Sequence, residues 1–257
     1  MKKVALILGA SEGLGYACAE ALIKENVYVC LVSRNEEKLK FALQKLNKIK
    51  KNHAIIFLGD LRDPNLIRNV IDLISIQWGK INILVNSNNG PKSGSVTNLT
   101  DQDWGDSLNS YALPVFRAIR EVLPGMKSQK WGRIITIGSI AALEPIANLD
   151  ISNFIRSGFL GVHKSLSREV AIDNVNVHVV LPGSIYTNRT QERIEQRAKH
   201  LNITNEESIS ISIAKIPKKR MGDPSDVGNL VAFLCSKKAD YLTGSFYTVD
   251  GGMSVSI

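Results

Sequence analysis

The sequence has few cysteines and no long apolar run. Its 257 residues include three cysteines, Cys18, Cys30 and Cys235, which lie far apart and in no metal-binding spacing. So sparse and odd a set fits a reducing cytoplasm better than a disulfide framework. The apolar start, Val4–Leu8, is too short for a secretion signal, and no stretch approaches the roughly 20 residues of a transmembrane helix. We expect a cytoplasmic protein without a metal site or a membrane partner.

Positive charge is in excess but is not concentrated. Lysine and arginine number 32 against 24 acidic residues, a net charge of +8. The densest basic groups lack the interleaved aromatic residues of a single-strand binding groove; they are Lys45, Lys48, Lys50 and Lys51, and Lys215, Lys218, Lys219 and Arg220. We therefore expect no nucleic-acid partner, and interpret the charge as that of a basic soluble protein or one with an anionic ligand.

Short β-branched runs alternate with longer amphipathic segments along the chain. The predicted strands are Val4–Leu8, Val27–Ser33, Ala54–Leu58, Ile81–Asn86, Arg133–Ile137, Val175–Leu181 and Phe246–Val249. Several are almost continuously apolar, as in parallel strands buried on both faces. No linker or internal repeat divides the chain. The pattern predicts one α/β domain, a doubly wound parallel seven-stranded sheet with helices on both faces.

Two helices have clear start signals, and one late segment breaks the alternation. Asn35 is a candidate N-cap before an apolar stripe, and Thr100 before another. The stripes are Leu39, Leu43, Leu46 and Ile49, and Trp104, Leu108, Tyr111, Val115, Ile119 and Val122. Residues 184–214 are polar and helical, which predicts a lid late in such a fold.

Three glycines join the first strand to the first helix, in the sequence Gly9-Ala10-Ser11-Glu12-Gly13-Leu14-Gly15. Gly9 allows a tight turn, Gly13 allows a pyrophosphate to approach the backbone, and Gly15 allows close helix–strand packing. The free N–H groups of the helix start favour the phosphate charge. The loop therefore predicts a dinucleotide site; the alternative is a plain strand-to-helix turn.

This Gly-x-x-x-Gly-x-Gly spacing resembles the short-chain dehydrogenase/reductase family. The later motifs that agree with the family, in order, are Gly59-Asp60-Leu61, Asn86-Ser87-Asn88-Asn89-Gly90, Pro182-Gly183 with Thr187, Arg220-Met221-Gly222-Asp223-Pro224, Leu242-Thr243-Gly244 and Val249-Asp250-Gly251-Gly252. The resemblance extends to 3-oxoacyl-carrier-protein reductase-like and glucose dehydrogenase-like members. It implies one NAD(P)-binding Rossmann domain over residues 1–257, hydride transfer to or from a small carbonyl or alcohol, and a homo-oligomer, either tetramer or dimer.

The resemblance also assigns cofactor contacts. Asp60 matches the residue that contacts adenine, and Thr187 the one that meets the nicotinamide amide. The other residues expected to bind the cofactor are Gly9, Ser11, Glu12, Gly13, Leu14, Gly15, Ser33, Arg34, Leu61, Asn86, Arg156, Pro182 and Gly183.

The end of the second predicted strand favours NADP over NAD. An acidic residue there binds the ribose 2′-hydroxyl, whereas the neutral Ser33 followed by Arg34 admits a 2′-phosphate. Glu12 opposes this preference, because NADP-preferring relatives usually carry a basic residue there and a carboxylate repels phosphate. We expect NADP, with NAD as the alternative; Arg34 would then be a solvated residue at a helix start.

The catalytic pattern of the family is only partly present. Relatives use a Ser, and a Tyr-x-x-x-Lys pair on a helix, supported by an Asn on the preceding helix. Ser139 matches the Ser, but Ser152 and Arg156 stand at the Tyr and Lys positions, and Tyr111 stands at the Asn position. A serine is too weak an acid to replace a phenol, whereas Arg156 stays charged and can still bond ribose hydroxyls. Loss of a positioned proton donor costs ~10²–10⁴ in rate.

Three other proton sources are candidates, each with a plainer interpretation. Tyr111 has the right chemistry but lies on an apolar stripe, and Tyr186 lies beside the Pro-Gly loop but suits lid packing. A water held by Ser139 and Ser152 is the third. The sequence thus predicts an oxidoreductase with a non-standard proton route; the alternative is an inactive NAD(P)-binding sensor or oligomeric partner.

Basic side chains of the predicted lid share one helical face. Arg189, Arg193 and Arg197 are spaced by four residues, with Glu195 and Lys199 as a further pair. We interpret this as a solvated face; the alternative is a clamp for an acidic substrate, such as the phosphate of an acyl thioester.

Overall fold

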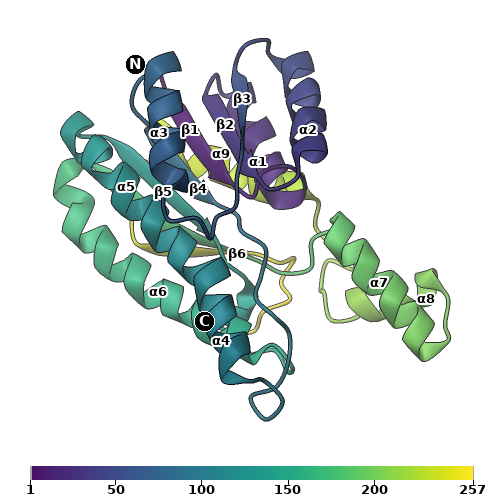
Figure 1. Ribbon diagram of the computed structural model, residues 1–257. Helices are drawn as coiled ribbons and strands as arrows, with labels where there is room; N and C mark the ends of the chain where they lie inside the picture. Colours follow the sequence, from purple (N-terminus) through teal and green to yellow (C-terminus); the bar gives the residue numbers. More distant parts are fainter. Residues whose placement is uncertain (1, 257) are drawn as a thin grey trace.

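Seven parallel strands form one sheet of order β3-β2-β1-β4-β5-β6-β7 in this computed structural model, which describes residues 2–256 (Figure 1). The strands are β1 (Val4–Leu8), β2 (Tyr28–Ser33), β3 (Ala54–Leu58), β4 (Ile83–Asn86), β5 (Gly132–Ile137), β6 (Val175–Pro182) and β7 (Ser245–Val249). The chain winds outward from β1 in one direction and then from β4 in the other. Ligands bind beside such a switch point, at the carboxyl ends of the strands. The predicted doubly wound single domain is confirmed.

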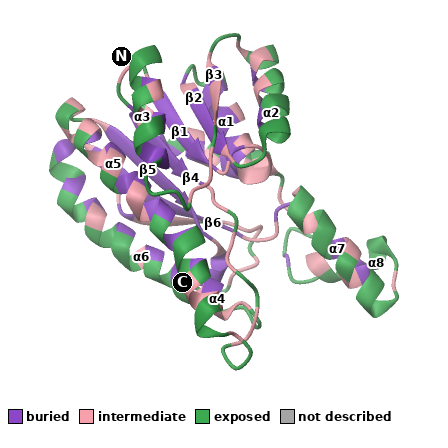
Figure 2. Ribbon diagram, viewed as in Figure 1, coloured by how far each residue is buried: buried purple, intermediate pink, exposed green. Residues whose placement is uncertain are grey.

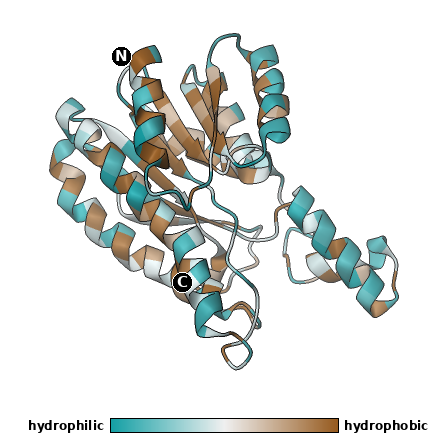
Figure 3. Ribbon diagram, viewed as in Figure 1, coloured by the Kyte–Doolittle hydropathy of each residue, from teal (hydrophilic) through white to brown (hydrophobic). Residues whose placement is uncertain are grey.

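Helices cover both faces of the sheet. One face carries α1 (Gly13–Lys24), α2 (Glu36–Ile49) and α9 (Pro224–Leu234), and the other α3 (Leu66–Gln77), α5 (Leu113–Gln129) and α6 (Asp150–Val170). Alternate residues of β1 enter the two cores: Leu6 packs in one, whereas Ile7 packs in the other. The strands β1, β2, β4, β5 and β6 are accordingly mostly buried, whereas β3 and β7 are partly exposed (Figure 2), and the outer helix faces mix hydrophilic and apolar residues (Figure 3).

Both predicted N-caps form. Asn35 Oδ1 accepts from the backbone N of Lys38 at 2.9 Å, and Thr100 forms a capping box with Asp103. The stripe behind Asn35 is shorter than predicted, because Ile49, in the last turn of α2, is 40% exposed. Val27 and Ile81, predicted to begin strands, precede the ladders of β2 and β4.

The helix predicted after Thr100 is not continuous. It comprises α4 (Asp101–Ser107), a π-helical turn over Leu108–Ala112, and α5. The N–H of Leu113 bonds to the carbonyl of Leu108, five residues back. This wide turn displaces the apolar stripe: Leu108 is 38% exposed, whereas Tyr111 is buried. Single π-helical turns within helices are frequent at functional sites.

Residues 184–214 contain α7 (Asn188–Leu201) and α8 (Asn205–Ile213), which project from the domain and are largely exposed (Figures 1 and 2). Arg197 joins them by donating to Ser208 at 3.0 Å and to Ser212. Arg197 therefore has a structural role and is not part of the solvated basic face that was predicted for it. The predicted lid motion remains a prediction. Within residues 2–256, no helix has the length and apolarity needed to cross a membrane.

Candidate functional site

The three glycines after β1 have distinct surroundings. A Cβ at Gly9, where φ is +65°, would lie 2.1 Å from the carbonyl oxygen of Ser87, and one at Gly15 would lie 2.4 Å from the carbonyl oxygen of Gly9. Gly13 has a similar φ of +60°, but its nearest neighbour would be Thr187 Cγ2 at 3.9 Å. Gly9 and Gly15 thus close the turn, while Gly13 faces open space beside the start of α7.

Unpaired polar atoms lie at the carboxyl end of β4. Asn86 donates through Nδ2 to Thr136 at 3.1 Å, but its Oδ1 is buried and unpaired, as are both polar atoms of the Asn88 side chain. Buried polar atoms without partners are rare in folded proteins, and at a strand end they are available to a polar ligand. With the open face of Gly13, these residues fit a bound dinucleotide.

The end of β2 presents a neutral hydroxyl pair and a cation. Ser33 and Ser11 are joined at 3.0 Å through their Oγ atoms. Arg34 is exposed and approaches Asp60 only to 3.7 Å, because Arg62 binds the same carboxylate at 2.6 Å. The hydrogen bond from Arg62 lowers the pKa of Asp60 to about 2, so this carboxylate stays ionised at neutral pH. Arg34 thus remains available to a further anion.

The sequence-based objection to a phosphate near Glu12 is weaker in the folded protein. Glu12 binds Lys38 Nζ at 2.7 Å and accepts from Asn188 Nδ2 at 2.8 Å. Burial alone raises the pKa of Glu12, but the bonds from Lys38 and Asn188 outweigh it and lower the pKa. Sequence reasoning missed Lys38; its place in the first turn of α2, shortly after Arg34, is the signal that could have found it.

Three of the four predicted catalytic residues lie in direct contact. Arg156 Nε donates to Ser152 Oγ at 2.8 Å, and Arg156 Nη1 donates to the carbonyl of Gly138. The guanidinium lies 5.1 Å from the centre of the Tyr111 ring. Ser139 is next to Gly138, and its Oγ accepts from the backbone N of Ala141 at 3.2 Å. Arg156 therefore connects the end of β5 to the π-helical turn.

The hydroxyl of Tyr111 has no hydrogen-bond partner among the described residues, although the side chain is only 2% exposed. Burial raises the pKa of Tyr111, an effect that the charges of Arg156 and Arg189 oppose in part. The group is thus a protonated phenol at neutral pH, next to Arg156. Tyr186, the other tyrosine considered, is 48% exposed.

A hydrogen-bonded chain supports the site from within the core. His163 Nδ1 lies 2.8 Å from the carbonyl of Phe159, which can only accept, so Nε2 accepts from Thr136 at 2.7 Å. Thr136 in turn accepts from Asn86. Burial lowers the pKa of His163 to about 4, which keeps the ring neutral as this chain requires. His163 is a packed residue, and it helps to hold Asn86.

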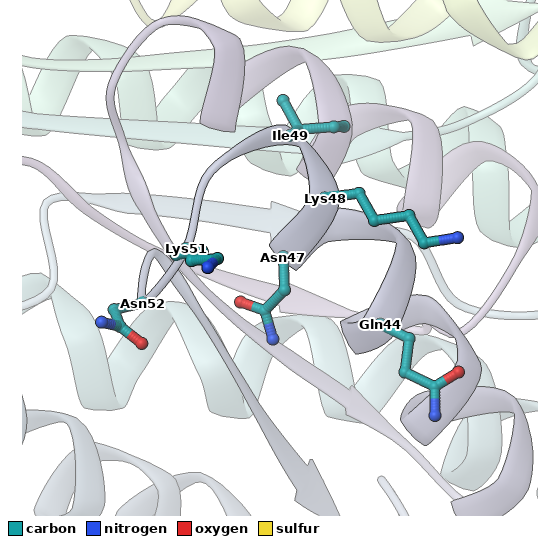
Figure 4. A pocket seen from close by; sticks show the side chains of 6 residues that line it. All are labelled: Gln44, Asn47, Lys48, Ile49, Lys51 and Asn52. Carbon is teal, nitrogen blue, oxygen red and sulfur yellow. The ribbon is translucent and has the colours of Figure 1, made fainter.

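Two surface hollows among the described residues lie away from the strand ends. One is at the carboxyl end of α2 (Figure 4) and is lined by Gln44, Asn47, Lys48, Ile49, Lys51 and Asn52. The other lies between α7 and α8 and is lined by Glu195, Ala198, Lys199, Asn202, Ile203 and Asn205. Neither holds a residue of the predicted site. Within residues 2–256, no three His, Cys, Asp or Glu side chains gather in a metal-binding arrangement.

Comparison with known proteins gives consistent relatives over the whole chain. A sequence model of the family described as enoyl-(acyl carrier protein) reductase matches residues 9–254. The chain is 32% identical over 253 residues to 3-oxoacyl-[acyl-carrier-protein] reductase FabG of Vibrio cholerae and, equally, of Escherichia coli, covering 98% of this chain and 97% of each relative.

Solved structures agree in fold throughout. YwfH, an NADPH-dependent reductase involved in bacilysin biosynthesis, superposes with a TM-score of 0.94 at 28% identity and full coverage of both chains. L-sorbose reductase from Gluconobacter frateurii, complexed with NADPH and L-sorbose, gives 0.94 at 29% identity, covering 100% of this chain and 98% of that one. The chain therefore belongs to the short-chain dehydrogenase/reductase family of NAD(P)-dependent oxidoreductases.

Proposed function

We propose that this protein reduces a small-molecule carbonyl compound with NADPH, using Tyr111 as the proton donor in place of the family's tyrosine. One observation carries the proposal: a buried phenol without a hydrogen-bond partner lies against Arg156, whose guanidinium also bonds to the carbonyl of Gly138 after β5. The site thus retains an acid of the right chemistry, although it comes from the preceding helix. This supports an active reductase over the inactive cofactor-binding alternative, which rested on Ser152 and Arg156 alone.

NADP is the cofactor that these residues fit best. Ser33 is neutral, Arg34 is available to a 2′-phosphate, and Lys38 neutralises Glu12. Relatives with solved structures, among them the L-sorbose reductase and the actinorhodin polyketide ketoreductase, are complexed with NADPH. Arg156 and Thr187 would hold its nicotinamide half, and Asp60 its adenine.

The side chains of the site have separate roles in the proposed reaction. The cofactor, when bound, supplies the hydride. The Ser139 hydroxyl, whose oxygen already accepts from Ala141, donates its hydrogen to the carbonyl oxygen of the substrate. Tyr111 then delivers a proton to that oxygen and is reprotonated from solvent. Ser152 positions Arg156 through the bond to Nε, and the guanidinium favours the transient phenolate.

Replacement of Tyr111 by Phe tests the proton donor. The change removes a hydroxyl that has no partner in the folded protein, so stability and NADPH affinity should be unchanged. The rate of NADPH-dependent reduction across a panel of carbonyl compounds should fall by ~10²–10⁴. Tyr186→Phe, which removes an exposed hydroxyl, is the matched control and should retain full activity. Full activity in Tyr111→Phe would show that Tyr111 only packs.

Replacement of Arg34 by Ala tests the cofactor preference. The variant should lose at least about tenfold in NADPH affinity, as a charge-assisted contact is removed, and little in NADH affinity. Calorimetric titration of both cofactors measures the difference. Arg68→Ala, which removes an exposed arginine paired with Glu121, is the control. Equal losses for both cofactors would refute a 2′-phosphate contact.

The proposal includes a cytoplasmic location and self-association. Cys18, Cys30 and Cys235 are buried and unpaired, as is usual in a reducing compartment. Phe154 and Val162 of α6 are large exposed apolar residues, which supports a homo-oligomer through this helix.

A further inference from the structure

Two arginines converge on Gly90, in the loop that follows β4. A Cβ built on this glycine would lie 3.2 Å from Arg156 Nη2 and 3.3 Å from Arg189 Nη1. One guanidinium comes from α6 and the other from α7, and both face the space that a side chain at this position would fill. The two positively charged guanidinium groups thus lie close together beside Gly90.

The pair has no counter-ion within residues 2–256. Arg156 forms hydrogen bonds with Ser152 and Gly138, whereas its Nη2 has no partner, and Arg189 forms neither a hydrogen bond nor an ion pair. Burial lowers the pKa of Arg189, and the charges of Arg193 and Arg156 lower it further, against opposing effects from Tyr111 and from Glu192 on the same helix. An anion between the two guanidinium groups would turn this repulsion into attraction.

The position of the pair indicates which ligand carries the anion. Asn188 and Arg189 are adjacent in α7 but reach different loops: Asn188 binds Glu12 of the glycine loop, whereas Arg189 reaches Gly90, beside Arg156. The glycine loop is the expected pyrophosphate site. Arg156 in turn covers the Tyr111 ring. An anion held by the two arginines therefore lies on the side of the proton donor, where the substrate reacts.

We propose that Arg156 and Arg189 bind a carboxylate of the substrate, so that the carbonyl compound is an oxo acid. This inference rests on the reductase function proposed above. A carboxylate suits the site because the planar guanidinium of Arg189 offers parallel N–H donors to its two oxygens, and Nη2 of Arg156 offers a further donor beside it. A cofactor phosphate shares this oxyanion chemistry, and the experiment separates the two sources.

Calorimetric titration of the protein saturated with NADPH tests the site, using malonate and its neutral analogue malonamide as probes. Malonate should bind at least about tenfold more tightly than malonamide. Arg189→Gln should abolish the preference without changing NADPH affinity. Arg193→Gln, an exposed arginine one turn further along α7, is the matched control and should keep the preference. Equal binding of the two probes to the wild-type protein would overturn the proposal.

A second titration identifies the source of the anion. If malonate raises the apparent Kd of NADPH, or if Arg189→Gln weakens NADPH, the site belongs to a cofactor phosphate and the substrate assignment is wrong. If malonate adds to the NADPH complex, the assignment is supported. Selective malonate binding without reduction of pyruvate, acetoacetate or other oxo acids would support the anion site and contradict the reductase function.

Discussion

Replacement of Gly9 by Ala is expected to prevent stable folding, with a loss of at least about 4 kcal/mol in the free energy of unfolding. The new methyl group would lie 2.1 Å from the Ser87 carbonyl oxygen, a backbone atom at the end of β4 that cannot move without breaking the centre of the sheet. The positive φ of Gly9 adds about 1–2 kcal/mol of strain for a residue with a Cβ. Urea unfolding followed by circular dichroism measures the loss.

Gly13→Ala is the matched control, because it imposes similar backbone strain without a collision. Its φ is +60°, and the nearest atom to the new methyl group lies 3.9 Å away. This variant should fold with a loss of about 1–2 kcal/mol. It should nevertheless lose at least roughly tenfold in NADPH affinity, because the methyl group occupies the face that a pyrophosphate approaches. Equal destabilisation by the two substitutions would contradict the distinct roles assigned to these glycines.

Acidification from pH 7.5 to pH 4 is expected to lower stability by about 3 kcal/mol through His163 alone. Burial holds the pKa of this histidine at about 4 in the folded protein, against 6.5 in the unfolded chain. Between these values the unfolded state binds one more proton. The stabilisation is therefore complete above pH 6.5, falls as the pH decreases through 4, and levels off about one unit below that value.

The difference between wild type and His163→Gln isolates this contribution from that of the carboxylates. Urea unfolding across the pH range should give a shallower decline in the variant, whatever its stability at pH 7.5. His200→Gln, which changes an exposed histidine of α7, should retain the wild-type slope. Parallel curves for wild type and His163→Gln would show that the ring titrates alike in both states.

The fold could be predicted because its signals are local. Runs of apolar β-branched residues placed every strand to within two residues, and the side chains of Asn35 and Thr100 fixed two helix starts. The glycine loop could be predicted equally well, since its spacing reflects turn geometry and close backbone packing. The π-helical turn could not be predicted from the sequence, because no residue type is typical of a hydrogen bond between an N–H and the carbonyl five residues before it.

The residues of the candidate site could be named from the sequence, but their arrangement could not be predicted. Ser139, Ser152, Arg156 and Tyr111 were all named from the sequence, yet the contact between Arg156 and Tyr111 depends on how two helices pack. The same holds for Lys38 with Glu12, and for Arg189 with Arg156. These contacts link residues distant in sequence through long side chains, whose directions no periodicity encodes.

Because of the π-helical turn at Leu108–Ala112, the position of the Tyr111 hydroxyl depends on the number of residues in this turn. Removal of one residue from this turn would leave a regular α-helix running from α4 into α5, and would rotate the preceding segment by roughly 100° about the helix axis. The packing of α5 would survive, whereas the phenol would leave Arg156. In evolutionary terms, an acid at this place can be gained or lost by insertion or deletion of a single codon, a route that comparisons of aligned substitutions do not register.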